Sequence, residues 1–378
     1  MTESPRAVVL VEDPGAANYA AELPEALESR GIAATLLAYG HAAEFLERRT
    51  SNPFTVVEDT DPEPVVERFR PSLVVVGTSE NPRSPALALI AACEERGIPT
   101  VGIVDSPAAS KLRFRGTTSD PLAYAPDWIL VPDLWTRSHY VELGHPEARV
   151  VVCGHPHYDF VRAFREKTRA SQARIRAELF PRASPERRVV IFAADLSTGL
   201  DPADYRRSPQ YTLRGRGESA GRTEIVLEEF LDALSPYRER IHCVMRLHPK
   251  HEIAELQAYV EEFDQVSQAE PSLDVLVGAD AAVGMTTMLL VEALLLRKPT
   301  LSIVPREFER GWIATTQYGL TPCATTRPAV REEVARLLEG SSLPDEPRVE
   351  AVLPRGSLAR TADAIVNALA DGGPGQPG

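Results

Sequence analysis

The stretch VGMTTMLLVEALLLRKPTLSIVP, residues 283–305, predicts a strand, a helix and a second strand in direct succession. The first strand ends at Gly284, the helix begins with Thr286 and Thr287, and the second apolar strand starts at Pro299. Short continuous apolar runs separated by helices are typical of parallel strands that are covered on both faces. This stretch therefore predicts a protein of the α/β class.

The same alternation continues on both sides of this stretch. Apolar runs such as AVVLVEDP at residues 7–14 alternate with amphipathic segments, and the alternation restarts with VVIFAAD at residues 189–195 after a polar, arginine-rich region. Two such units predict two Rossmann-like domains that bind ligands at the carboxyl ends of their strands. We expect an N-terminal domain over residues 1–160, a linker helix region over 161–188, a C-terminal domain over 189–370 and a disordered tail over 371–378.

The composition excludes several classes of protein. The 378 residues include 41 Lys and Arg against 54 Asp and Glu, a net charge of −13 that repels nucleic acid and anionic membranes. The four cysteines are far apart and form no metal-binding pattern, which fits a reducing compartment. The N-terminus lacks the features of a signal peptide, and no apolar run approaches the roughly 20 residues that span a bilayer. We expect a cytoplasmic protein, monomeric or dimeric, without a metal and without nucleic-acid or integral membrane association.

The start of the predicted helix at Thr286 and Thr287 is a candidate anion site. Free backbone N–H groups and the helix dipole both favour a negative group at a helix N-terminus, so this turn can hold a diphosphate. Glu292 follows where a carboxylate can accept hydrogen bonds from both ribose hydroxyls. The alternative is an ordinary capped helix with a solvated glutamate.

Three segments resemble glycosyltransferases of the GT-B fold. VCGHPHYD at residues 152–159 is similar to a segment of lipid-A-disaccharide synthase, and RLHPKHE at 246–252 is similar to the His-Pro segment of CDP-glycerol glycerophosphotransferases and capsule-sugar transferases. A third pattern of those transferases matches Gly284, Thr286, Thr287, Glu292, Ala293, Lys298 and Pro299. The resemblance implies two Rossmann-like domains that face each other across a cleft and a nucleotide-diphosphate donor.

The resemblance also assigns roles to residues of the C-terminal domain. Gly284, Thr286 and Thr287 would contact the donor phosphates, and Glu292 would bind the ribose. His248 would face the same phosphates as a catalytic donor or positive charge, and the alternative is a structural cap at a strand end. Two basic residues that flank His248 would add positive charge: Arg246 and Lys250.

The loop EDPGAANY at residues 12–19 is the candidate acceptor side of the N-terminal domain. A carboxylate in this region can deprotonate an attacking hydroxyl, and Asp13 is the first candidate for that base, with Glu12 and Glu80 as the next candidates. Capping of the following helix is an equally good interpretation of Asp13. Residues 105–116 form either an anion-binding loop or a solvated turn. The full set of predicted acceptor-side residues is Glu12, Gly15, Asn18, Glu80 and Arg113.

The segment 196–222 is an arginine-rich insert in the second unit. It can close over an anionic substrate as a lid, and the alternative is a mobile polar loop.

These observations predict a metal-independent transferase without a cofactor. It would move a sugar or related group from a nucleotide-diphosphate donor to a small soluble acceptor hydroxyl. One alternative is an enzyme similar to hydrolysing UDP-N-acetylglucosamine 2-epimerases, although EDPGAAN stands where those enzymes typically have G-T-R-P-E. The other is a catalytically silent nucleotide-binding protein of the same fold.

Overall fold

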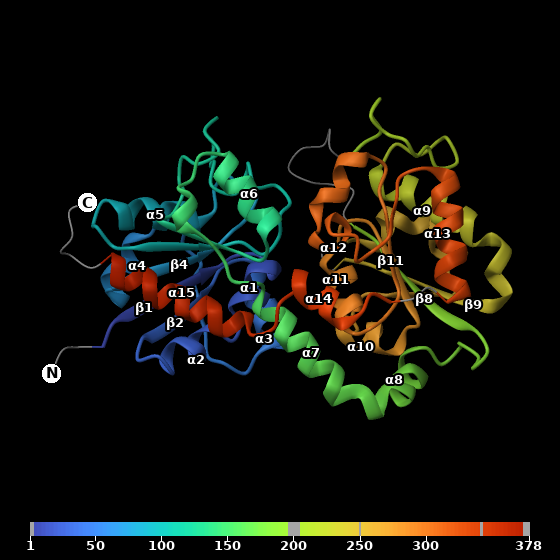
Figure 1. The fold of residues 1–378 in the computed structure, drawn as a ribbon, viewed down its shortest axis with the longest axis horizontal. Helices are drawn as coiled ribbons and strands as arrows, with labels where there is room; N and C mark the ends of the chain where they lie inside the picture. Colours follow the sequence, from blue (N-terminus) through green and yellow to red (C-terminus); the bar gives the residue numbers. More distant parts are fainter. Residues whose placement is uncertain (1–3, 196–204, 249–250, 341–342, 373–378) are drawn as a thin grey trace. The chain divides into compact units, whose positions relative to one another are not determined.

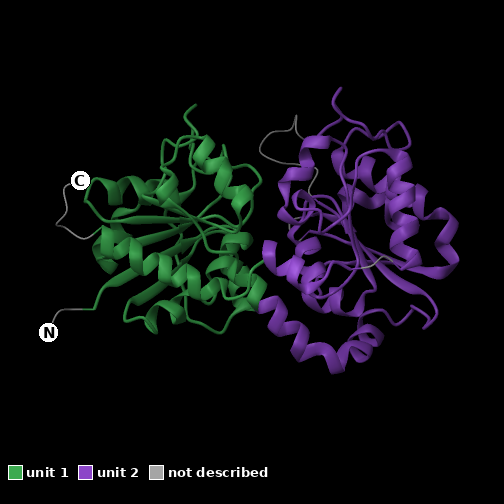
Figure 2. Ribbon diagram, viewed as in Figure 1, with its two compact units in different colours: residues 1–159, 353–378 green, residues 160–352 purple. Residues whose placement is uncertain are grey.

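The computed structural model describes residues 4–195, 205–248, 251–340 and 343–372. The chain forms two compact units (Figure 2). Unit 1 comprises residues 1–159 and 353–378, and unit 2 comprises residues 160–352. In both units the described strands form a parallel sheet, which confirms the predicted α/β class with two Rossmann-like domains.

The sheet of unit 1 has the strand order β3-β2-β1-β4-β5-β6-β7. Figure 1 labels β1, β2 and β4 of this sheet. Its strands are β1 Arg6–Val11, β2 Ala33–Ala38, β3 Thr55–Val56, β4 Leu73–Gly77, β5 Thr100–Ile103, β6 Trp128–Val131 and β7 Val150–Val152. Its helices are α1 Pro14–Ala20, α2 Leu23–Glu28, α3 His41–Arg49, α4 Glu63–Phe69, α5 Pro85–Glu94, α6 Leu134–Glu142 and α15 Ser357–Asp371, with a 3-10 turn η1 at Glu147–Arg149.

Strand β1 shows why this sheet is covered on both faces. Its side chains alternate between two hydrophobic clusters, with Val9 and Val11 in one and Val8 and Leu10 in the other. The first cluster includes residues of α1, α2, α3 and α15, and the second includes residues of α4, α5 and α6. Because successive strand residues point to opposite faces, an unbroken apolar run is needed to fill both clusters.

The sheet of unit 2 has the strand order β10-β9-β8-β11-β12-β13. Its strands are β8 Arg188–Ala193, β9 Ile241–Arg246, β10 Gln265–Ser267, β11 Ala281–Gly284, β12 Thr300–Ile303 and β13 Cys323–Ala324. Its helices are α8 Gln172–Leu179, α9 Arg222–Leu234, α10 Ser272–Gly278, α11 Met288–Leu295, α12 Ala314–Gln317, α13 Arg327–Glu339 and α14 Glu346–Val352, and α7 Pro156–Thr168 enters it from unit 1. The 3-10 helices of this unit are η2 Arg169–Ser171, η3 Ser235–Arg240, η4 Ile253–Glu262 and η5 Glu307–Trp312.

Both sheets contain a position where the chain changes its direction of travel across the sheet. In unit 1 this position lies between β1 and β4, and in unit 2 it lies between β8 and β11. The loops after these strands leave to opposite sides, which opens a crevice at the carboxyl ends where α/β proteins bind ligands. The candidate site is therefore sought at these two edges.

The units differ from the expected domains at two places. Residues 161–188 are not a separate linker, because α7, η2 and α8 belong to unit 2, where Arg176 of α8 pairs with Asp280 at 2.6 Å. The last helix, α15, belongs to unit 1, where its Ala362, Ile365 and Ala368 fill the first cluster. Most of the expected tail, residues 373–378, lies outside the described residues.

No helix within the described ranges is both long and apolar enough to cross a membrane.

Asp159 fixes the start of α15 to the rest of unit 1. Its carboxylate accepts hydrogen bonds from the backbone N–H groups of Gly356 at 2.9 Å, Ser357 at 2.7 Å and Leu358 at 3.3 Å. These are donors of a helix start that no residue of the helix itself can satisfy.

We predict that Asp159→Ala weakens the docking of α15 by about 1–2 kcal/mol, as expected for the loss of a helix cap. Hydrogen exchange of the α15 amides should accelerate correspondingly. Asp159→Asn, which keeps an acceptor oxygen, should have a smaller effect. Unchanged exchange in Asp159→Ala would show that the apolar contacts alone hold the helix.

Candidate functional site

In unit 2, a carboxylate occupies the place where the sequence predicts a phosphate. Asp195 follows β8, and its Oδ2 accepts hydrogen bonds from both the backbone N–H and the hydroxyl of Thr286, each at 3.1 Å. Arg222, the first residue of α9, lies 3.4 Å from the same oxygen and donates to the Thr286 hydroxyl at 3.2 Å. The donors of Thr286 and Arg222 thus form an anion site, which Asp195 fills.

Beneath this contact lies a buried group of charges. Glu309 of η5 is fully buried and accepts hydrogen bonds from two buried arginines, Arg222 at 2.8 Å and Arg306. The ring of Trp312 packs against both guanidinium groups, whose carbon atoms lie 5.4 and 5.6 Å from its centre. Burial acts to lower the pKa of Arg222, but the charges of Glu309 and Asp195 outweigh it and raise that pKa.

Helix α11 begins two residues later than predicted, at Met288. Thr287 is its N-cap, and its hydroxyl accepts a hydrogen bond from the N–H of Leu289 at 3.3 Å. Gly284 ends β11 in close contact, since a Cβ there would lie 3.1 Å from the Thr287 methyl group. The alternative of a capped helix is therefore correct for Thr287, and its contact with a phosphate stays a prediction.

Glu292 is buried, with 8% of its surface exposed, so the alternative of a solvated glutamate is wrong. Arg246 at the end of β9 is buried too, and its guanidinium donates to the Ser267 hydroxyl at 2.8 Å and the Glu270 carbonyl at 2.7 Å. Burial lowers the pKa of Arg246, while the charges of Glu270 and Glu292 act in the opposite direction. Arg246 is thus engaged by protein groups at the strand end, and its predicted phosphate contact remains a prediction.

The His-Pro segment contributes a residue that sequence reasoning missed. The backbone N–H of His248 donates to Nδ1 of His251 at 3.2 Å, which fixes His251 as the tautomer with its proton on Nε2. Burial lowers the pKa of His251, and the charges of Glu255, Asp195 and Glu224 oppose that shift. The sequence feature that could have drawn attention to His251 is the presence of a second histidine three positions after His248. Lys250 lies outside the described residues.

In unit 1, the loops after β4 and β5 form a second polar group. Arg113 is buried and donates to Asp105 at 2.8 Å and to the Thr78 hydroxyl at 2.7 Å. A Cβ at Gly15 would lie 1.9 Å from Oδ2 of Asp105, so only glycine permits this approach. Burial acts to lower the pKa of Arg113, but Asp105 and Glu80 are among the charges that raise it. The alternative of a solvated turn at residues 105–116 is therefore wrong for Arg113.

Glu12, a predicted acceptor-side residue, lies in the loop after β1. Its Oε1 accepts a hydrogen bond from the side chain of Asn81 at 2.7 Å, while Oε2 is buried and has no hydrogen-bond partner among the described residues. Asp13 is the N-cap residue of α1, although its side chain makes no capping hydrogen bond. Asn18 accepts from Arg49 of α3 at 3.1 Å, so it joins two helices.

Within the described ranges, no group of three or more His, Cys, Asp or Glu side chains is arranged to hold a metal ion.

Comparison with known proteins identifies the fold. No family model and no curated protein matches the chain. UDP-GlcNAc 2-epimerase from Neisseria meningitidis, solved with UDP-GlcNAc bound, superposes with a TM-score of 0.66 at 14% identity over 97% of this chain and 100% of that one. UDP-GlcNAc 2-epimerase from Methanocaldococcus jannaschii superposes with a TM-score of 0.64 at 13% identity, over 96% of this chain and 99% of that one. A glycosyltransferase from Rickettsia africae superposes with a TM-score of 0.55 at 10% identity, over 98% of this chain and 97% of that one.

These neighbours confirm the expected GT-B type of fold and correct the expected function. Several of the similar structures are UDP-GlcNAc 2-epimerases, so the predicted transfer of a sugar to an acceptor hydroxyl is wrong, and the epimerase alternative fits better. The specific likeness to CDP-glycerol transferases has no counterpart among these structures. At identities of 14% or less, the likeness establishes the fold.

We predict that Glu309→Gln destabilises unit 2 by about 3–5 kcal/mol, because two buried arginines lose their shared counter-charge. Thermal unfolding measures the loss. The matched control is Glu307→Gln on the same 3-10 helix, where an exposed carboxylate pairs with Arg310 at 3.0 Å. That control should change stability by less than about 1 kcal/mol. Equal effects of the two variants would contradict the structural importance of the buried group.

Proposed function

We propose that this chain binds UDP-GlcNAc or a closely related UDP-N-acetylhexosamine and changes the configuration at C2 of its sugar. The observation that carries the proposal is the Glu12 carboxylate, which has one oxygen oriented by Asn81 and the other buried without a partner among the described residues. Such a group favours a ligand that donates a proton to it. The fold shared with UDP-GlcNAc 2-epimerases supports the same conclusion.

The chemistry of the sugar sets the order of the steps. A C2–H bond without an adjacent carbonyl is too weakly acidic for simple deprotonation, so the proton leaves as the C1–O bond breaks. The C–H electrons form a C1=C2 double bond, and UDP leaves with the electrons of the C1–O bond. A proton then returns to C2 on the opposite face while water or UDP adds to C1. The reaction has no net oxidation or reduction and therefore requires no redox cofactor.

Unit 1 supplies the groups for the proton transfers in this proposal. Glu12 removes the C2 proton, and Asp13 and Glu80 are the candidates for returning one. Asp105 is held by Arg113 at 2.8 Å, and we assign this ion pair to orienting the loop.

Unit 2 supplies the groups for UDP. Glu292 binds the ribose, and Thr286, Thr287 and the two histidines of the His-Pro segment bind the diphosphate. Stabilisation of the departing diphosphate by such fixed donors is a large contribution to catalysis. Because Asp195 already occupies the donors of Thr286, binding of the diphosphate displaces its carboxylate.

The proposal predicts that the protein exchanges the C2 hydrogen of UDP-GlcNAc with solvent. After incubation in D2O, NMR should detect deuterium at C2 together with the epimerised sugar, and release of free UDP distinguishes addition of water from addition of UDP. Glu12→Gln should lower the rate by about 10²–10⁴-fold, the contribution of a general base. Glu28→Gln, an exposed glutamate of α2, is the control and should be fully active.

Binding of UDP without any deuterium at C2 would reject the epimerase and leave the catalytically silent nucleotide-binding alternative. Exchange that is equally fast in Glu12→Gln would reject Glu12 as the base.

A second prediction concerns Asp195. Asp195→Asn removes a negative charge that competes with the diphosphate, so UDP should bind more tightly by about 1–2 kcal/mol, roughly five- to thirtyfold in Kd. Isothermal titration calorimetry measures this change. A Kd that is unchanged or weaker would show that UDP does not replace the Asp195 carboxylate.

A further inference from the structure

The described part of the arginine-rich insert, residues 205–221, is a packed segment that we call the strap. Its two ends pair with each other, since the N–H of Arg207 donates to the Ala220 carbonyl at 2.7 Å and the N–H of Arg222 donates to the Tyr205 carbonyl at 2.8 Å. Between these ends, Leu213 is buried in the core of unit 2. Residues 205–221 thus make defined contacts with unit 2, while the lid and the mobile loop both stay predictions and residues 196–204 lie outside the described ranges.

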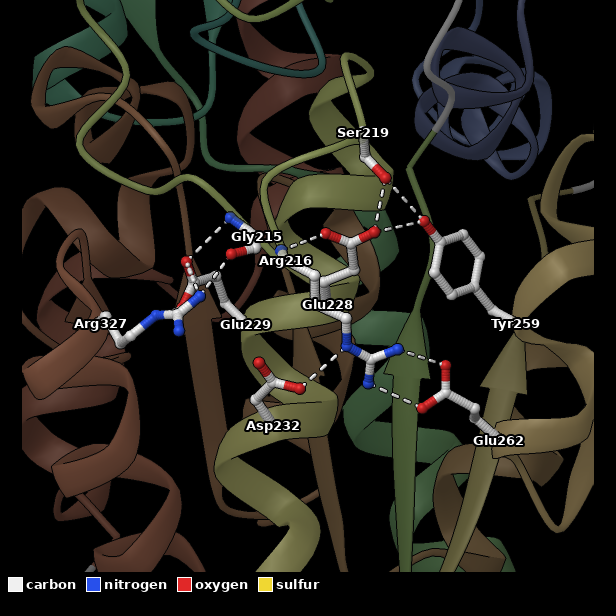
Figure 3. Close-up of polar contacts among 9 residues, drawn as sticks. All are labelled: Gly215, Arg216, Ser219, Glu228, Glu229, Asp232, Tyr259, Glu262 and Arg327. Carbon is white, nitrogen blue, oxygen red and sulfur yellow. Dashed lines mark hydrogen bonds and ion pairs between the residues drawn. The ribbon is translucent and has the colours of Figure 1, made fainter.

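Two consecutive glutamates of α9 bind the backbone of the strap (Figure 3). Oε1 of Glu229 accepts hydrogen bonds from the N–H groups of Arg214 at 3.2 Å and Gly215 at 2.9 Å, and Oε2 of Glu228 accepts from the N–H of Arg216. Both carboxylates are buried, with 4% exposure for Glu228 and 2% for Glu229. Gly215 has a φ of +59°, and a Cβ there would lie 2.2 Å from the Glu228 carboxylate.

The remaining oxygens of the two carboxylates are also satisfied. The Tyr259 hydroxyl donates to Oε1 of Glu228 at 2.7 Å, and Arg327 pairs with Oε2 of Glu229 at 2.7 Å. The pKa of Tyr259 is raised to about 12, chiefly by burial. Its hydroxyl therefore keeps its proton and acts as a donor at neutral pH. Buried carboxylates that are completely hydrogen-bonded hold one geometry firmly. We call Glu228 and Glu229 the glutamate clamp.

The strap connects this clamp to the buried arginines of the candidate site. The Tyr211 ring centre lies 5.2 Å from the guanidinium carbon of Arg306. Both the N–H and the hydroxyl of Thr212 donate to the Pro305 carbonyl at 2.8 Å, directly before Arg306. At the start of the strap, the Tyr205 carbonyl accepts a hydrogen bond from the backbone N–H of Arg222. It therefore contacts both arginines that share Glu309.

We propose that Glu228 and Glu229 are positioning residues for the nucleotide-sugar site of unit 2. They hold the strap, and the strap holds Arg306 and Arg222 in the arrangement that presents Thr286 to the diphosphate. This inference rests on the proposed binding of UDP by unit 2. A site whose supporting residues are fixed before the ligand arrives binds with less reorganisation than one that is not.

The test compares two variants that release the strap from opposite sides. Glu229→Gln removes the charge from the helix side, and Gly215→Ala pushes the strap away without changing α9. In both, amide exchange of the strap should accelerate about tenfold. The Kd for UDP and the KM for UDP-GlcNAc should rise about tenfold, whereas kcat should stay within about twofold, because the proton-transfer groups are untouched.

Glu262→Gln is the matched control. It removes the bidentate partner of Arg216, 2.7 Å away at the outer side of the clamp, but leaves the strap amides bound to Glu228 and Glu229. Its Kd for UDP should equal that of the wild type. A wild type that does not bind UDP would reject the proposed function and this inference together. A wild type that binds UDP, with clamp variants that fold and bind it equally well, would overturn this inference alone.

Discussion

Both sheets of this protein are buried on their two faces, and this constraint limits where polar groups can lie in the strands. A parallel strand in such a sheet offers mostly apolar side chains to the helices that cover it, as β1 does with its alternating contributions to two clusters. The loops that follow the strands are therefore favourable places for polar groups. At the carboxyl ends, the change in strand direction brings loops from distant parts of the chain together, and both polar groups described above lie at such an edge.

At these edges, the protein repeatedly satisfies a buried charge with a partner that is remote in sequence. Asp195 accepts a hydrogen bond from Thr286, and Glu309 accepts one from Arg222. Glu228 and Glu229 accept hydrogen bonds from the backbone of the strap. An isolated charge in these positions would be strongly unfavourable, so each partner is needed once the other is buried. The result in unit 2 is a continuous set of contacts from the exposed pair of Arg216 and Glu262 to the start of α11. The stability of this unit therefore depends on contacts that reach the candidate site.

The sequence predicted the elements better than it predicted their partners. The strands were predictable because short unbroken apolar runs between helices are typical of buried parallel strands. The helix after β11 was predictable because two threonines precede a longer apolar segment. The docking of α15 onto unit 1 was not predictable, because amphipathic spacing reveals an apolar face but not what covers it. The Asp195–Thr286 contact joins residues 91 positions apart, and no local pattern encodes it. Glu12 and Asp13 are neighbours with the same charge, and no local pattern shows that Glu12 accepts a hydrogen bond from Asn81 while Asp13 is the N-cap residue of α1.

The return of α15 to unit 1 has a consequence for biosynthesis. Because residues 160–352 lie between the two parts of unit 1, the ribosome completes all of unit 2 before it makes the helix that unit 1 requires. Until then, the apolar surface of α2 and β6 that α15 will cover, with Ala362, Ile365 and Ala368 on its buried face, remains open in the nascent chain. Domains usually fold in order as they are synthesised, from the N-terminus onward. Here unit 1 departs from that order, because it needs a segment that is synthesised after the whole of unit 2.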